Sequence, residues 1–230
     1  MRAGKIITRI NIILFVFTVI GGLCYDLISA DLITKSCASG CFVLLGGINL
    51  VYGICRKWKY RSVAWILMAG LAAGFLADVA LEIDFIQGAA VFAVGHILYL
   101  AAYCILLPVK PSDFIPGAIL CIFVIAAMVL LPVFDFGGSL MQAVAIVYAV
   151  LISAMWSKAH SNFRKAPCKF TKWLAMGSFL FLFSDFALLI ARFTPVPGFV
   201  SSFCVNAYYP GQAVLACSLL YMDESNTRIS

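Results

Sequence analysis

Two aspartates stand inside long apolar stretches, where a carboxylate is costly. Asp78 lies near the end of the apolar stretch 62–81, and Asp185 lies within the stretch 173–191. A charged side chain at membrane depth costs about 2.5–3.5 kcal/mol even on insertion scales, so each of these carboxyl groups needs a function or a partner. Two carboxyl groups in different environments can serve as a general acid and a general base. The pair predicts acid–base chemistry at membrane depth.

Other polar side chains fall in the same half of the membrane. Counted at about 1.5 Å per residue from the predicted outer helix ends, Asp78 lies roughly 5 Å deep, and Asp185 and Tyr209 roughly 9 Å deep. Each polar residue also has a structural interpretation, because a lysine can anchor a helix end and a histidine can fill a packed core. The candidates for contact with a substrate are Lys35, His96, Tyr99, Ser184, Tyr209 and Gln212.

The residues exclude several other chemistries. The sequence has only two histidines, His96 and His160, and we place the second in a cytosolic loop, so a multi-histidine zinc site lacks ligands. The nine cysteines form no Cys-x-x-Cys pair and mostly lie in apolar stretches. No Gly-x-Ser-x-Gly elbow and no phosphate-binding glycine loop occurs. We therefore expect no metal and no cofactor.

The elements that must position these residues are membrane helices. Hydrophobic residues make up 64% of the 230 residues and charged residues 11%, whereas a soluble domain is roughly 45–50% apolar. Continuous apolar stretches favour helices over a barrel. We predict an all-α polytopic membrane protein whose residues 1–230 form one domain, a bundle of eight transmembrane helices. The expected spans are about 10–28, 36–55, 62–81, 85–107, 114–131, 138–156, 173–191 and 203–221.

The basic residues give this bundle an orientation. All Lys and Arg residues except Lys35 and Arg192 fall on one predicted side, which places both termini in the cytosol. The net charge of +6 follows from this topology, so we expect no nucleic-acid partner. The expected location is a bacterial inner membrane, or the endoplasmic reticulum if the source is eukaryotic. The oligomeric state stays open.

Several motifs together resemble the YhhN family of membrane proteins, which includes the lysoplasmalogenases. The resemblance covers most of the chain from Lys35 to about Cys217, in the family's order and with its eight-helix layout. The sequence departs slightly from the family's pattern at Gly74, Ala77 and Gly211, and these departures concern the helix face beside Asp78. The matching segments are Gly70-Leu-Ala-Ala-Gly-Phe-Leu-Ala-Asp78, Gly88-x-x-x-Phe92-x-x-x-His96-Ile-Leu-Tyr99, Tyr148 with Met155-Trp156, Phe183-Ser184-Asp185 with Arg192-Phe193, and Tyr208-Tyr209-x-x-Gln212.

This resemblance implies hydrolysis of the vinyl ether bond of a lysoplasmalogen to a fatty aldehyde and glycerophosphoethanolamine or glycerophosphocholine. It also implies that Asp78 and Asp185 are the catalytic pair. Our hypothesis makes Asp185, as the deeper and more desolvated carboxyl group, the acid and Asp78 the base that directs water, although the roles can be reversed. The remaining candidates would orient water or the glycerol hydroxyl, and Lys35 would contact the phosphate.

Two other classes of function stay open at this point. Membrane-buried aspartate and histidine residues also form proton relays, so the first alternative is a proton-coupled transporter of lipids or small molecules. Against it, the eight stretches show no clear inverted repeat. The second is a non-catalytic membrane partner protein whose polar residues only join helices. A transporter predicts transport without cleavage, and a partner protein predicts tolerance of single Asp to Asn changes.

Overall fold

In the computed structural model, the described residues form eight α-helices, with a short 3-10 helix between the fourth and the fifth. The structure describes residues 2–56, 58–196 and 198–222, with side chains from residue 4 onward. Within these residues no strand occurs. The elements in chain order are α1 (Arg2–Leu27), α2 (Leu32–Cys55), α3 (Arg61–Ile83), α4 (Phe85–Leu106), η1 (Pro111–Phe114), α5 (Ile115–Leu130), α6 (Ser139–Lys165), α7 (Lys169–Phe193) and α8 (Phe199–Ser218).

Seven of these helices are long and apolar enough to cross a membrane, counting only the described residues. The prediction of an all-helical polytopic membrane protein is confirmed, whereas its count of eight spans is not. The exception is α8, which carries polar residues such as Asn206 and Gln212 along its length. It lies against α1, α2, α3 and α7 and buries most of its second half. Gln212 and Ser218 are fully buried, so these polar residues lower the hydropathy of α8 without facing lipid.

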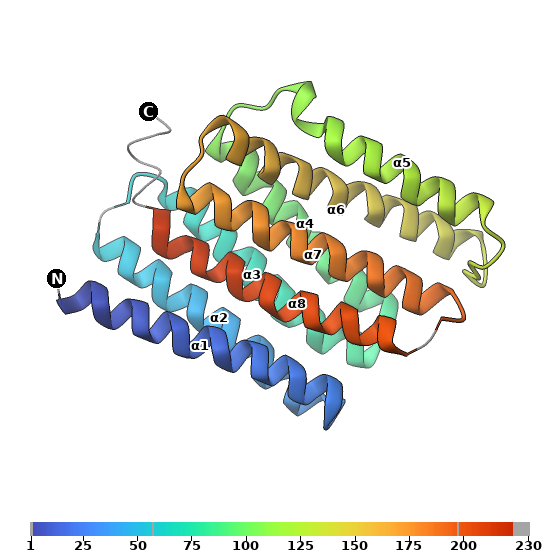
Figure 1. The fold of residues 1–230 in the computed structure, drawn as a ribbon, viewed down its shortest axis with the longest axis horizontal. Coiled ribbons are helices and arrows are strands. Elements are labelled where there is room, and N and C mark those ends of the chain that lie inside the picture. The colour runs from blue at the N-terminus through green and yellow to red at the C-terminus, as the bar shows by residue number, and fades with distance from the viewer. Residues whose placement is uncertain (1, 57, 197, 223–230) are drawn as a thin grey trace.

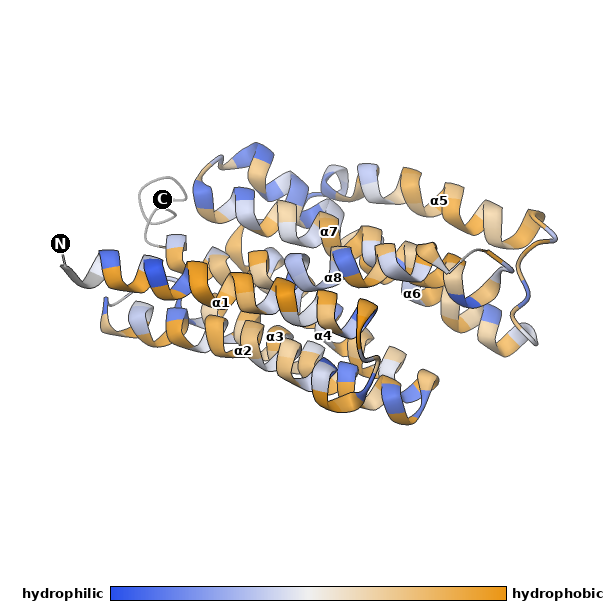
Figure 2. Cartoon of the chain, turned by 60° about the horizontal axis from the view of Figure 1, so that its bottom comes forward, coloured by the Kyte–Doolittle hydropathy of each residue, from blue (hydrophilic) through white to orange (hydrophobic). Residues whose placement is uncertain are grey.

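The helices run side by side, with α1 beginning and α8 ending at the same end of the bundle (Figure 1). We call this the terminal end, and we call the opposite end, where α1 ends and α2 begins, the site end. Hydrophobic residues cover much of the helices' length, and many strongly hydrophilic ones gather toward the two ends (Figure 2). Which end faces the cytosol stays a prediction. This prediction depends on the basic residues, and three of them lie outside the described side chains: Arg2, Lys57 and Arg228.

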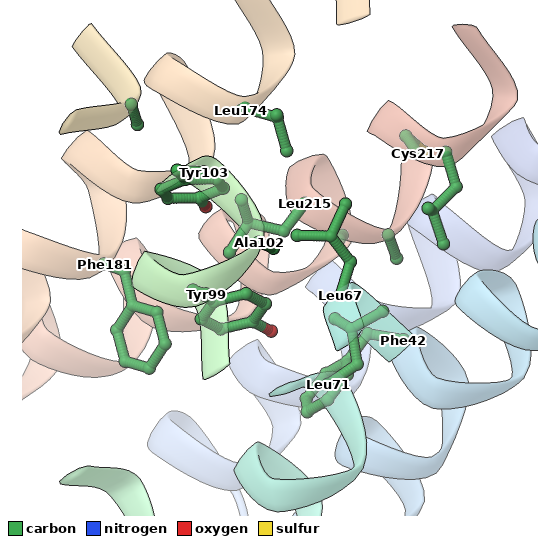
Figure 3. Packing of buried hydrophobic residues seen from close by; sticks show 14 of the residues in the cluster. Phe42, Leu67, Leu71, Tyr99, Ala102, Tyr103, Leu174, Phe181, Leu215 and Cys217 are labelled. Atoms are coloured by element: carbon green, nitrogen blue, oxygen red, sulfur yellow. The ribbon is translucent and has the colours of Figure 1, made fainter. Parts of the chain in front are cut away.

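Small residues let the central helices approach closely. Gly70 and Gly74 of α3 are both buried, as expected for a stripe that packs against protein. A Cβ atom on Gly70 would lie 2.6 Å from the Tyr99 ring, so this glycine makes room for an aromatic residue of α4. Figure 3 shows Tyr99 and its neighbour Tyr103 among buried side chains of α3, α7 and α8. This packing fixes α4 against the helices that carry the two aspartates.

Acidic residues at the site end cap the N-terminal ends of two helices. Asp31 accepts a 2.7 Å hydrogen bond from the Thr34 backbone N–H at the start of α2, and Asp84 accepts one of 2.8 Å from that of Gln87 in α4. Bonds from the Ser29 hydroxyl and the Thr34 backbone lower the pKa of Asp31. Each carboxylate satisfies an N–H group that lacks a partner within its helix.

The prediction for the segment after the sixth span is wrong. The stretch 157–165, which contains His160 and which we expected to be loop, continues α6 as helix. The reason is a buried ion pair: the Lys158 side chain, fully buried, lies with its Nζ 2.9 Å from Asp113 of η1. Lys165 also pairs with this carboxylate, and Ser161 donates a 2.9 Å hydrogen bond to it. Hydropathy measures the apolar length of a helix and does not detect such an extension.

Candidate active site

A cavity of about 330 Å³ is lined by residues of α1, α2, α3, α4, α7 and α8, including Tyr25 near the end of α1 and Lys35 near the start of α2. Asp78 of α3 and Asp185 of α7 both border it. The two carboxyl groups singled out in the sequence therefore line one cavity, although they are 107 residues apart in the chain (185 minus 78). The other polar residues of its lining are Tyr25, Asp26, Lys35, Ser184, Ser201, Tyr208 and Tyr209.

Hydroxyl groups from two other helices hold Asp78 in place. Ser39 of α2 donates a 2.5 Å hydrogen bond to its Oδ2 atom, and Tyr208 of α8 donates one of 2.7 Å to the same atom. The Tyr208 ring is itself held by edge-on contacts with Phe42, Phe92 and Phe181. Both bonds reach Oδ2, so the described residues give Oδ1 no hydrogen bond. One oxygen is fixed and the other is free for water or a substrate.

Asp185 has a histidine and a tyrosine around its Oδ2 atom. The Tyr148 hydroxyl of α6 donates a 3.0 Å hydrogen bond to it, and His96 Nε2 of α4 lies 3.0 Å from it. His96 Nε2 also lies 2.8 Å from the Tyr148 hydroxyl. Because the only hydroxyl proton of Tyr148 goes to Asp185, Nε2 enters this triangle as a donor. The imidazole Nδ1 is buried with no partner among the described residues.

The order of burial differs from the sequence-based hypothesis. Asp78 is 2% exposed and Asp185 is 8% exposed, so Asp185 is not the more desolvated of the two. Residue counting gives depth along a helix, but burial also depends on the helices around it, and Asp78 faces α2 and α8. Greater desolvation of Asp185 therefore cannot be the reason for choosing it as the acid.

Two predicted site residues lie behind the cavity. The Tyr99 hydroxyl donates a 2.9 Å hydrogen bond to Gln212 Oε1, and both side chains are fully buried. Neither belongs to the cavity lining. Gln212 Nε2 lies 3.5 Å from the Tyr208 hydroxyl. These two residues are connected to Asp78 only through Tyr208, and neither side chain borders the cavity in which a substrate would lie.

Lys35 borders the cavity as part of an ion pair. Its Nζ atom lies 2.8 Å from Glu82 Oε1 and 5.2 Å from the centre of the Tyr25 ring. The Tyr25 hydroxyl donates a 2.9 Å hydrogen bond to the same Glu82 oxygen. An ammonium group has three donors, so this lysine retains capacity for a second anion.

The last two predicted residues, Ser184 and Tyr209, also border the cavity. The Ser184 hydroxyl lies 3.5 Å from the Cys204 thiol. The Tyr209 hydroxyl is buried and has no hydrogen-bond partner among the described residues. A buried hydroxyl without a partner is uncommon and needs a reason, such as a ligand or a water molecule.

An apolar groove meets the cavity at Asp185. The groove lies among α4, α6 and α7, where aliphatic and aromatic side chains such as Phe85, Met141 and Leu189 line it. It reaches the outer face of the bundle at Val144, which is exposed. Asp185 borders both the groove and the cavity. Asp185 therefore has polar side chains of the cavity on one side and apolar side chains of the groove, whose volume is about 60 Å³, on the other.

The sequence reasoning did not select three residues that touch the aspartates: Ser39, Tyr148 and Tyr208. Tyr208 had a usable signal, because Tyr208 and Gln212 are four residues apart and share a helix face. The described residues contain no group of three His, Cys, Asp or Glu side chains placed to hold a metal ion.

Fold and site together define an integral membrane protein with a pair of buried carboxyl groups in one cavity. Comparison with protein families gives a match to the YhhN family over residues 33–219. The chain therefore belongs to the YhhN family, which includes lysoplasmalogenases. Comparison with curated proteins and with solved structures gave no significant match.

Proposed function

We propose that this protein is a lysoplasmalogenase, an integral membrane enzyme that hydrolyses the vinyl ether bond of a lysoplasmalogen. The observation that carries the proposal is the position of Asp185, which borders both a polar cavity and an apolar groove. A lysoplasmalogen has the same division, because its vinyl ether joins an apolar chain to a polar glycerophosphate. Family membership supports the same reaction.

The chemistry requires an acid. A vinyl ether is inert to base, but protonation of the carbon β to oxygen gives an oxocarbenium ion that water can trap. We assign the acid to Asp185, because the groove that accommodates the chain ends at this residue. The assignment rests on the position of Asp185 at the groove, because Asp185 is not the more buried of the two aspartates. A carboxyl group held by Tyr148 and His96 has a fixed direction toward the carbon.

Asp78 then directs water to the oxocarbenium carbon. It lies on the polar side of the cavity, and its Oδ1 atom has no hydrogen bond among the described residues. As water adds, its proton passes to the Asp78 carboxylate. The hemiacetal hydroxyl next gives its proton to Asp185 while the C–O bond to glycerol breaks, and the departing glycerol oxygen takes the proton held by Asp78. One water is consumed, and these transfers leave Asp185 protonated and Asp78 ionised, which is the starting state.

Lys35 would contact the phosphate beside the cavity. Because it also pairs with Glu82, the phosphate either shares its donors or replaces the glutamate. The enzyme would act in a bacterial inner membrane, or in the endoplasmic reticulum if the source is eukaryotic, with both termini in the cytosol.

The test is aldehyde release from lysoplasmenylethanolamine by the purified full-length protein. We expect aldehyde from the wild-type protein, none from Asp78→Asn or Asp185→Asn, and none from a saturated-ether analogue. Asp135→Asn is the matched control, because this carboxylate is exposed and bonds only the nearby Gly137 backbone. Full activity in either catalytic variant would refute the carboxylate pair. No aldehyde from well-folded protein would refute the proposed function, and a flux assay would then test the transporter alternative.

A further inference from the structure

The cavity holds a third carboxylate that the proposed reaction does not use. Asp26 lies in the last turn of α1, half-buried, and borders the cavity. Ser202 donates a 3.0 Å hydrogen bond to its Oδ1 atom, and Asn206 donates one of 3.1 Å to Oδ2. Both donors are neutral, and the described residues provide no cationic partner. The charge of Asp26 is therefore oriented but not neutralised.

Its place in the helix makes this unpaired charge more costly. The C-terminal end of a helix carries a partial negative charge, and a carboxylate there is unfavourable unless a cation is near. The last turn of α1 contains no basic residue. Lys35 pairs with Glu82, and among the described residues it forms no ion pair with Asp26. This corner of the cavity attracts a positively charged group.

A cation borders the same cavity. The chain turns from the end of α1 into α2 within residues 28–31, and Lys35 near the start of α2 lines the cavity. The N-terminal end of α2 is already capped by the Asp31 carboxylate, so the group there that attracts a further anion is the Lys35 ammonium. The cavity thus has a carboxylate at Asp26 and an ammonium group at Lys35, whose Nζ lies 5.2 Å from the centre of the Tyr25 ring. A zwitterion matches this arrangement.

A second observation indicates a polar ligand. The Tyr209 hydroxyl is on a residue only 2% exposed, borders the same cavity and has no partner among the described residues. We infer that Asp26 is the residue that binds the cationic amine of the lysophospholipid headgroup, beside the Lys35 side chain that the proposed function assigns to the phosphate. This inference rests on the proposed function for the identity of the lipid.

A binding experiment tests the inference without requiring catalysis. The probes are two saturated-ether lysolipids, alkylglycerophosphoethanolamine and alkylglycerophosphoethanol, which share the phosphodiester and differ only in the ammonium group. Isothermal titration of full-length protein in nanodiscs measures both dissociation constants. A charge-assisted hydrogen bond predicts that wild-type protein prefers the amine-bearing lipid by about tenfold or more. We expect Asp26→Asn to abolish this preference and Asp135→Asn to retain it.

Two results would overturn the inference. Equal affinity of the wild-type protein for the two lipids would do so even if the Asp26 variant failed to fold. Retention of the preference by a folded Asp26→Asn protein would place the amine elsewhere. A failure of the proposed function is recorded separately, as absence of aldehyde from the vinyl ether substrate, and the binding ratio can be measured in that case too.

Discussion

The hydroxyl of Tyr148 provides a quantitative test of the acid. In the proposed first step, Asp185 gives its proton to carbon and becomes negatively charged, so its bonds from Tyr148 and His96 strengthen in the transition state. A neutral hydrogen bond contributes about 1 kcal/mol and a bond to a charged group about 1.5–3 kcal/mol. The difference of about 0.5–2 kcal/mol corresponds to a fall in kcat of about 2- to 30-fold in Tyr148→Phe.

The fold should tolerate this change. His96 Nε2 stays 3.0 Å from Asp185, so the variant leaves neither partner without a bond. Tyr103→Phe is the matched control, because this tyrosine is also fully buried and makes one 2.8 Å bond, to Ser178. It borders neither the cavity nor the groove.

The measurements are initial rates of aldehyde release at saturating lysoplasmenylethanolamine, with thermal unfolding of each variant in the same detergent. We expect lower kcat only in Tyr148→Phe, and similar small losses of stability in both variants. An unchanged kcat in Tyr148→Phe, or an equal fall in Tyr103→Phe, would refute the assignment of Asp185 as the acid held by this tyrosine.

Two further changes separate binding from folding. Lys35→Ala should raise the KM for the lysolipid and leave kcat nearly unchanged, because a phosphate contact is the same in ground and transition states; a pure loss of kcat in steady-state assays would contradict it. Asp113→Asn should lower stability by about 3–5 kcal/mol, because it leaves the fully buried Lys158 without its ion pair. Thermal unfolding measures this loss, and stability equal to that of Asp135→Asn would argue against the buried pair.

Hydropathy and the cost of burying charge were enough to predict the helices and the two aspartates. An aspartate in an apolar stretch is rare and therefore informative. Burying a hydroxyl group such as that of Ser39 or Tyr148 costs little free energy, and such residues are common. Their presence in an apolar stretch therefore does not indicate a site. Neighbours in α8 show the same limit: Tyr208 and Tyr209 point about 100° apart on a helix, and only the packing shows that Tyr208 bonds Asp78.

The polarity of α8 explains both its weak membrane signal and its importance for the site. A polar side chain in a membrane helix is tolerated where other helices satisfy it, and α8 lies against four of them. By contrast, α5 is strongly apolar, packs mainly on α6 and η1, and contributes no residue to the cavity. In the proposed function, the lipid substrate approaches Asp185 from between helices, along the groove among α4, α6 and α7, whose lining includes both Asp185 and the exposed Val144.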